Sequence, residues 1–401
     1  MSRSATESDK NRTGRDEWRE VLASILLAKT AVATFAIAPF LVGAYIDHLN
    51  LSVGHASRTL SVEIFALAFS NATAFFWVHR VACRAWAQRL LLLLIALNIG
   101  CVFVSDFASL VALRALVGVV EGSLLALGFG LLGITRRPNR NFGLYFAVSL
   151  TVGALNIRIL PLFLESAGVT GLFVNLSLYA VIALGGSIWI QRTSIAERNE
   201  IPVATAGDRP ESPFAIATMP LLFLMVANYV YFIGQGGTWS FLERIGVQQA
   251  IDLTGIASAL SLSMVAGVAG GAAAGFLDLK LGRVVPLLTA IALSIAAMCL
   301  LLGGVTVATF TLAACMFNFG NNMGHPYVLG FAAKIDKSSR LTVLSGALHT
   351  GGQATGPLIA GLIVTGNDFT NVLWLGLAAF TATVLLLLPV VVSMHATAKP
   401  A

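Results

Sequence analysis

Long apolar runs alternate with short polar segments along nearly the whole chain. Twelve of these runs are long enough to cross a bilayer as helices, because about 20 apolar residues span the hydrocarbon core. They cover residues 21–46, 56–78, 86–104, 107–133, 142–163, 170–191, 215–241, 253–276, 284–304, 307–332, 341–365 and 370–393. The pattern therefore predicts an all-α integral membrane protein with twelve transmembrane helices in two six-helix halves.

The polar segments set the predicted boundaries of these halves. The longest polar segment after the N-terminus contains Pro202, Pro210 and Pro213 and is typical of a linker. The first 18 residues are polar and charged, which indicates a disordered tail. We expect a cytoplasmic N-terminal tail over 1–20, an N-terminal half over 21–191, a cytoplasmic linker over 192–213, a C-terminal half over 214–393 and a cytoplasmic C-terminal tail over 394–401.

Composition and charge agree with a membrane location. The chain is 57% hydrophobic and only 11% charged, which excludes a soluble globular domain. Of its 25 Lys and Arg residues, 20 fall in the tails or in alternate loops that lie on one side of the membrane. Because basic residues collect in cytoplasmic loops, we expect both termini inside the cell membrane, whether an inner or a plasma membrane. The net charge of +6 then indicates loops near anionic lipid and no nucleic-acid partner.

The sequence carries no motif of enzyme or cofactor chemistry. Its four cysteines are scattered singly, so neither a metal site nor a disulfide framework is implied. HExxH, GxSxG and Walker patterns are absent from the sequence, and we expect neither an enzyme nor a cofactor. A membrane sensor would normally add a soluble output domain, which the sequence does not show.

A polar island, Gly275-Phe-Leu-Asp278-Leu-Lys280-Leu-Gly282-Arg283, separates two apolar runs. It predicts a tight turn between helices, with glycines that permit close backbone approach and basic side chains that stay in water. The segment resembles the G-x-L-x-D-[RK]-x-G-R signature between the second and third helices of each half in the major facilitator superfamily of secondary transporters. The corresponding segment of the first half keeps only Arg84. The resemblance implies that a set of surface residues controls conformational change without binding substrate: Asp278, Lys280, Gly282, Arg283 and Arg84.

Charged residues inside the apolar runs are the next candidates, because ionisable groups are expensive in the bilayer. Lys29 lies near the middle of the first span and Glu63 about two turns into the second. In the fourth span, Arg114, Gly118 and Glu121 share one helical face, which resembles the superfamily's R-x-x-x-G motif. Each charge either forms a structural pair or acts on a substrate or a coupling proton.

Neutral polar residues form stripes on two further helices. The seventh span carries Asn228, Tyr231, Gln235 and Trp239, and the tenth carries Asn318, Asn321, Asn322 and His325. Such stripes fit a water-filled cavity, although an interhelical hydrogen-bond network is the alternative. In the superfamily the first, fourth, seventh and tenth helices line the central cavity. For His349 in the eleventh span we expect a packed histidine, and for the glycines that follow it, small-residue helix packing.

These features predict a secondary active transporter that moves a small organic solute by alternating access. Two cations facing a neutral stripe suit an organic anion with a carboxylate. The predicted substrate-binding residues are Lys29, Arg114, Asn228, Tyr231, Gln235, Trp239, Asn318, Asn321, Asn322 and His325. Glu121 or Glu63 would carry a coupling proton during uptake, and we expect a monomer. Proton-coupled export of amphipathic or drug-like compounds is the alternative, and a non-transporting membrane sensor is the alternative from another class.

Overall fold

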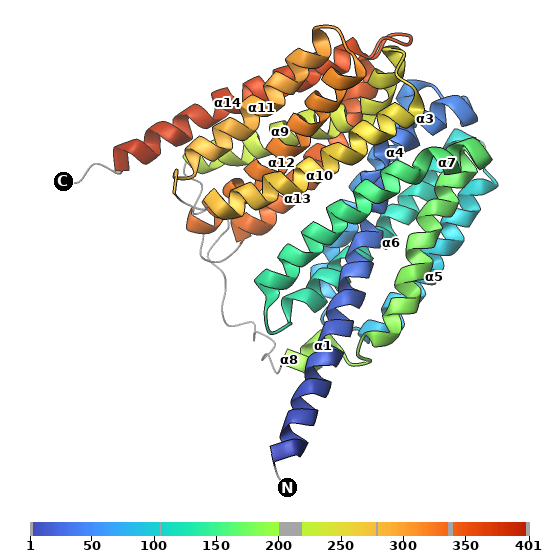
Figure 1. Cartoon of the computed structure of the whole chain (residues 1–401), viewed down its shortest axis with the longest axis vertical. Helices are drawn as coiled ribbons and strands as arrows, with labels where there is room; N and C mark the ends of the chain where they lie inside the picture. Colours follow the sequence, from blue (N-terminus) through green and yellow to red (C-terminus); the bar gives the residue numbers. More distant parts are fainter. Residues whose placement is uncertain (1–2, 105, 200–218, 278–279, 336–339, 398–401) are drawn as a thin grey trace. The chain divides into compact units, whose positions relative to one another are not determined.

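The computed structural model describes residues 3–104, 106–199, 219–277, 280–335 and 340–397, and the regular elements within them are helices (Figure 1). The α-helices are α1 Arg3–Ala31, α2 Ala33–Ala36, α3 Ala38–Leu49, α4 Val53–Thr73, α5 Cys83–Val102, α6 Phe107–Gly133, α7 Pro138–Gly186, α8 Ile195–Asn199, α9 Met219–Gln248, α10 Leu253–Leu277, α11 Val284–Leu302, α12 Val307–Ile335, α13 Arg340–Ile363 and α14 Thr370–Thr397. Two 3₁₀-helices follow α4 and α7, η1 Ala74–Phe76 and η2 Ser187–Trp189. The predicted all-α fold is confirmed.

Each predicted span coincides with helical structure in the described residues. The first span is divided into α1, α2 and α3, and the fifth and sixth spans form the single element α7, whose backbone leaves the helical region at Ala167 and Gly168. Gly168 takes a φ of 57°, which a residue without a Cβ adopts easily. Within the described residues, seven helices are long and apolar enough to cross a membrane, by length and composition.

The beginning of the chain differs from the prediction. Helix α1 begins at Arg3, so the described part of the segment predicted to be a disordered tail is helical. The physical reason is composition, because seven of residues 3–18 are Arg, Glu, Ala or Lys, which are good helix formers although most of them are polar.

Backbone contacts divide the chain into two compact units. The first unit comprises Met1–Ala36, Ala66–Ser149 and Thr170–Asp208, and the second comprises Ile37–Phe65, Leu150–Val169 and Arg209–Ala401. Residues 37–65 and 150–169 therefore group with the second unit, although they belong to the predicted N-terminal half. The division into two six-helix halves stays a prediction.

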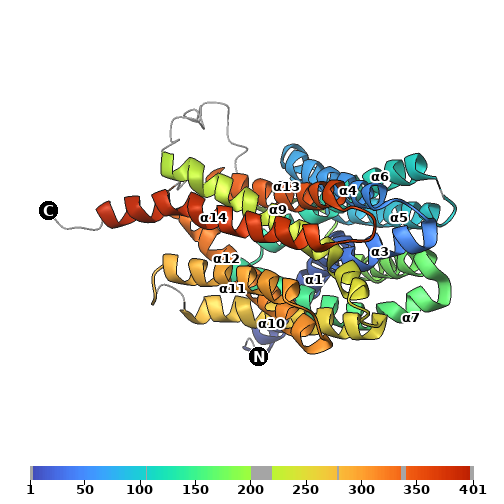
Figure 2. The same cartoon turned by 90° about the horizontal axis from the view of Figure 1, so that it is seen from above.

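In the second unit, α9 packs against both α13 and α14 (Figure 2). The α9–α13 contact is close enough for backbones to touch. A Cβ added at Gly356 would lie 2.4 Å from the amide nitrogen of Gly237, and one added at Gly352 would lie 2.6 Å from the carbonyl oxygen of Tyr229. The small-residue packing predicted for the glycines after His349 is confirmed. It also brings the side chain of His349 against α9.

Asp106 caps the N-terminus of α6, where its side chain accepts a hydrogen bond of 2.9 Å from the amide of Ser109. This bond lowers the pKa of Asp106 below its ordinary value of 3.8. The cap therefore contributes its full stability at a pH above 3.8, the pKa of the unfolded chain. Its contribution is lost as the pH falls through the lower pKa of the folded state. We expect Asp106→Ala to lower the melting temperature at about pH 6, and this difference should shrink as the pH falls below 3.8, because protonation weakens the cap. Asp106→Asn, which keeps the acceptor, should stay close to the wild type at about pH 6 in the same thermal unfolding measurement.

Candidate functional site

A buried polar network surrounds Arg114 in the first unit. The Arg114 side chain is completely buried, and its Nη1 donates to Oδ1 of Asn98 at 2.9 Å. Its Nη2 donates to the hydroxyl of Thr34 at 3.1 Å, and that hydroxyl in turn donates to Oε1 of Glu121 at 2.7 Å. The ring of Phe173 lies 5.7 Å from the guanidinium carbon. The network therefore joins the predicted cation and the predicted proton carrier through one threonine.

The break in the first span places Thr34 in this network. Thr34 belongs to α2, a single turn that follows the end of α1 at Ala31 and precedes Ile37, whose φ and ψ of −98° and 9° are not helical. In an uninterrupted helix a threonine hydroxyl often bonds to the carbonyl four residues earlier. The Thr34 hydroxyl instead bonds across to α6. Arg114 and Glu121 share one face of α6, as predicted from their seven-residue spacing.

Lys29 is a second buried cation of the same unit. Its side chain is only 3% exposed, and its ammonium lies 5.5 Å from the centre of the Tyr179 ring. Among the residues that the structure describes, the ammonium makes no hydrogen bond or ion pair. The contacts of Lys29 and Arg114 are thus with different residues, and the assisting role predicted for Lys29 stays a prediction. The other predicted proton carrier, Glu63, is buried in the second unit.

The stripe predicted on the seventh span, α9, divides between two neighbours. The amide of Asn228 donates to the carbonyl oxygen of Ser345 at 2.9 Å, and Gln235 accepts a bond of 3.2 Å from Gln353, so both face α13. The hydroxyl of Tyr231 instead lies 3.1 Å from that of Ser294 on α11. Three residues at 100° each place Tyr231 roughly 60° around the helix from Asn228, which explains the split. Trp239 is buried on the same helix.

The polar residues of α12 are partly used within the second unit. Asn318 donates to the Ser263 hydroxyl at 2.8 Å, and Asn322 donates to the Asn318 carbonyl at 2.9 Å. The interhelical alternative therefore describes Asn318, whereas the bond of Asn322 stays within α12. Asn321 has a buried Oδ1 without a hydrogen-bond partner among the described residues. His325 contacts His349, which we describe below.

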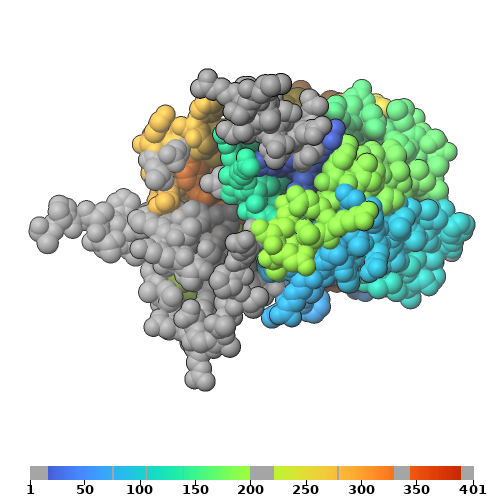
Figure 3. All heavy atoms as spheres, turned by 90° about the horizontal axis from the view of Figure 1, so that it is seen from below, coloured from blue at the N-terminus to red at the C-terminus, as the bar shows by residue number. Residues whose placement is uncertain are grey.

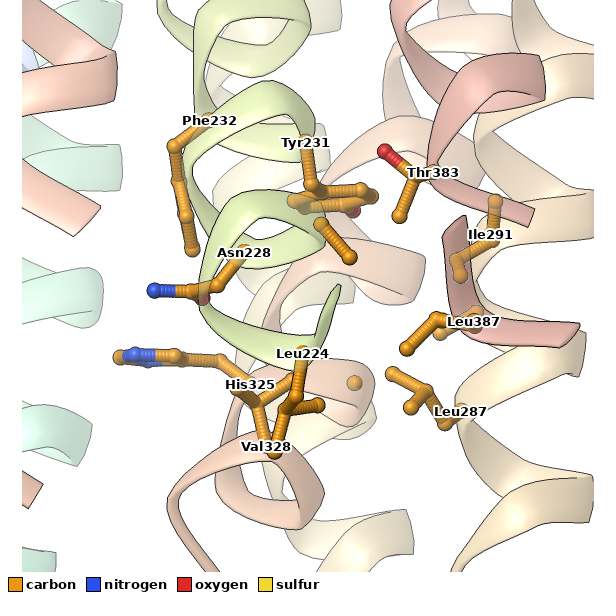
Figure 4. A pocket seen from close by; sticks show the side chains of 13 residues that line it. Leu224, Asn228, Tyr231, Phe232, Leu287, Ile291, His325, Val328, Thr383 and Leu387 are labelled. Carbon is orange, nitrogen blue, oxygen red and sulfur yellow. The ribbon is translucent and has the colours of Figure 1, made fainter. Parts of the chain in front are cut away.

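A narrow pocket in the second unit brings three predicted substrate-binding residues together, Asn228, Tyr231 and His325 (Figure 4). It lies between α9, α11, α12 and α14 and has a cavity volume of only about 20 Å³, close to that of one water-sized group. Its other side chains are mostly apolar, and in Figure 4 those of Leu287 and Leu387 point toward it. The pocket suits an apolar or aromatic group better than a charge.

An ion cluster at the end of α9 was missed in the sequence. Arg244 donates from its two Nη atoms to both carboxylate oxygens of Asp47, at 2.8 and 2.6 Å, and from Nε to Glu243 at 2.6 Å. Glu243 is buried whereas the Asp47 side chain is half exposed. A Cβ at Gly43 would lie 2.4 Å from Oε2 of Glu243. All four residues belong to the second unit.

Polar partners of the predicted residues were also missed. Asn98 lies in the third span, from which no site residue was predicted, yet it is buried and binds Arg114. An amide within the apolar run that follows Arg89 is the signal that could have found it. Thr34 left no such signal, because threonines are common in membrane helices.

The residues predicted to control conformation are only partly described. Asp278 lies outside the described residues. Lys280 is exposed, Gly282 takes a φ of 67°, and Arg283 directly precedes α11. In the first unit Arg84 donates from Nε to the Ile190 carbonyl at 2.7 Å. Figure 3 shows residues 187–199 beside the segment around Arg84, where Ala196 also donates to the His79 carbonyl at 3.1 Å.

Comparison with solved structures identifies the fold as that of the major facilitator superfamily of transporters. A mutant of the nucleoside transporter NupG matches with a TM-score of 0.75 and 12% identity over 94% of this chain and 99% of that one. A mutant of the peptide transporter POT matches with a TM-score of 0.71 and 14% identity over 92% and 93%. A bacterial homolog of the human lysosomal transporter Spinster, in an inward-facing and unoccupied conformation, matches with a TM-score of 0.67 and 15% identity over 94% and 95%. No protein-family model and no curated protein matches the sequence.

Proposed function

We propose that the protein is a secondary active transporter that takes up a small organic anion by alternating access, and that it is not an enzyme. The fold supports transport, because its solved neighbours are described as transporters of nucleosides and peptides. Fold alone does not determine function, so the argument for the substrate comes from the site.

Lys29 is the observation that carries the anion proposal. An ammonium in the middle of an apolar span, with neither a hydrogen bond nor an ion pair among the described residues, is costly unless an anion compensates it for part of the cycle. The Arg114 network adds a second positive charge to the same unit. A carboxylate is the group that both cations bind best, and the planar guanidinium can grip it through two hydrogen bonds.

Proton coupling follows from the link between Glu121 and Arg114. Because the Thr34 hydroxyl bonds to both, a change in the charge of Glu121 alters the hydrogen bonding of the Arg114 guanidinium. A proton on Glu121 would therefore favour an anionic substrate at the arginine. Glu63 is the second candidate for the proton, and a monomer in the cell membrane with both termini in the cytoplasm is the state we propose.

Export of amphipathic compounds is a second candidate function. The apolar pocket of the second unit favours it, since Leu224, Ile291 and Leu387 line it together with the phenol of Tyr231. This lining would contact an apolar group of an uncharged compound without using either cation.

Arg114→Lys tests the proposal. Lysine keeps the charge but not the fork that binds Asn98 and Thr34, so we expect carboxylates to bind about tenfold more weakly. The measurement is thermal stabilisation of the purified protein by a panel of organic carboxylates and by their amides or esters, since a ligand of the folded state raises its melting temperature. The exposed Arg89, changed to lysine, is the matched control. Equal stabilisation of the wild type by the neutral analogues would contradict anion transport and favour the exporter.

A further inference from the structure

Two histidines from different helices of the second unit lie in direct contact. Nδ1 of His349 on α13 is 3.0 Å from Nε2 of His325 on α12, and the two ring planes are nearly perpendicular, at 83°. At this distance one ring must donate an N–H to the lone pair of the other, because two donors or two lone pairs would repel. The contact joins a residue predicted to bind substrate to one predicted only to pack.

One aromatic ring contacts both histidines. Phe232 of α9 stacks on His349 with ring centres 3.7 Å apart and planes within 7°, and it meets the edge of His325 at 5.4 Å. The glycine contact between α9 and α13 holds this stack, since a Cβ at Gly352 would lie 2.8 Å from the Phe232 Cβ. The face of an aromatic ring attracts a cation, so Phe232 favours a positive charge on the ring that it covers.

The pair can take up a single proton without losing its hydrogen bond. In the neutral pair, one ring donates and still has a lone pair on its other nitrogen. A proton added there gives an imidazolium that donates to a neutral imidazole, and a hydrogen bond with a charged donor is stronger than a neutral one. A second proton would set two N–H groups and two positive charges against each other at 3.0 Å. The geometry therefore defines a site for one proton and one charge.

The surroundings of the pair are uncharged within the described part of the chain. The titratable neighbours from α9 are Tyr231 and Tyr229, the latter bound through its hydroxyl to Thr355 of α13 at 2.8 Å, and α13 adds the amide of Gln353. The lining contributed by α11 and α14 is Leu287, Ala290, Ile291, Thr383 and Leu387. Asn228 lines the same pocket, and its buried Oδ1 has no hydrogen-bond partner among the described residues. In Figure 4 the amide nitrogen of Asn228 and the His325 ring extend toward the same side.

We propose that the His325–His349 pair is a proton-binding site that gives the second unit one positive charge when it is loaded. A metal ion is the other partner of paired imidazoles, but the described residues contain no group of three His, Cys, Asp or Glu side chains that could hold one. The use of this proton in transport rests on the proposed function. The binding of the proton does not, and it is tested without any substrate.

The test is nitrogen NMR of the full-length protein, labelled at its histidines, in lipid nanodiscs over a range of pH. We expect two ring signals that change together in one transition, with uptake of one proton per molecule. His349→Gln should remove that transition and return His325 to the behaviour of a single ring. His79→Gln, at an exposed histidine of the first unit, is the matched control and should leave the transition unchanged.

A second variant keeps both rings. Phe232→Leu removes the stacked aromatic face, so roughly three- to tenfold higher proton concentration should be needed for half-loading. Independent transitions of the two rings, or no transition between about pH 4 and about pH 9, would overturn the proposal, and so would signals that respond to Zn²⁺ and revert with a chelator. The carboxylate panel reports on the cations of the first unit, so its failure would contradict anion transport without affecting the histidine pair.

Discussion

Replacing Lys29 by methionine is expected to raise the thermal stability of the ligand-free protein and to remove its stabilisation by carboxylates. Methionine fills nearly the same volume as the lysine stem but carries no charge. A buried ammonium costs about 2.5–3.5 kcal/mol at the centre of a membrane helix, and its desolvated contact with the Tyr179 ring returns about 2 kcal/mol of this. We therefore expect Lys29→Met to gain on the order of 1 kcal/mol.

The two effects have opposite signs, which makes the prediction easy to contradict. If the lysine served only as a structural element, its replacement would destabilise the protein. If it is a binding residue whose burial costs stability, its replacement stabilises the protein. Thermal unfolding with and without carboxylates measures both effects on one sample. The exposed Lys280, changed to methionine, controls for the general effect of removing a charge. If Lys29→Met lowers the melting temperature and carboxylates still stabilise the variant, Lys29 is not part of the anion site.

Arg244→Ala is expected to have the largest effect on stability. It leaves the buried carboxylate of Glu243 without its cation, and breaking a buried ion pair in this way costs about 3–5 kcal/mol. The half-exposed Asp47 remains hydrated, so Asp47→Asn should cost much less. Thermal unfolding should therefore rank Arg244→Ala well below Asp47→Asn.

A double variant separates charge from packing at this cluster. Adding Glu243→Gln to Arg244→Ala removes the stranded carboxylate and should recover most of the lost stability. Arg58→Ala, at an exposed arginine of the same unit, is the matched control and should be nearly neutral. If the double variant is no more stable than Arg244→Ala, packing of the arginine stem and not its charge holds the cluster together.

The membrane helices could be predicted from the sequence because a bilayer imposes one simple requirement, about 20 apolar residues in a row. The shared face of Arg114 and Glu121 could be predicted as well, since seven residues make nearly two turns. The helical start at Arg3 was predicted incorrectly because polarity was taken as a sign of disorder. Intrinsic helix propensity acts independently of polarity.

The partners of the site residues could not be predicted. Thr34, Asn98 and His349 contact partners on other helices, and the choice of neighbour depends on packing and not on periodicity. Tyr231 shows why a polar stripe on one helix does not predict its partners. It lies about 60° around α9 from Asn228 and therefore faces α11 and not α13.

The contact of Gly43 with the ion cluster limits which residues can occupy position 43. A methyl group at this position would lie 2.4 Å from a carboxylate oxygen of Glu243 and 3.0 Å from a guanidinium nitrogen of Arg244. Every other amino acid brings at least that methyl group, so a saturation library screened for folded protein should retain glycine at position 43 as long as positions 243 and 244 keep their charges. A shortened side chain at position 243 should open position 43 to alanine. The two positions, about 200 residues apart in the chain, would then vary together in any set of functional variants.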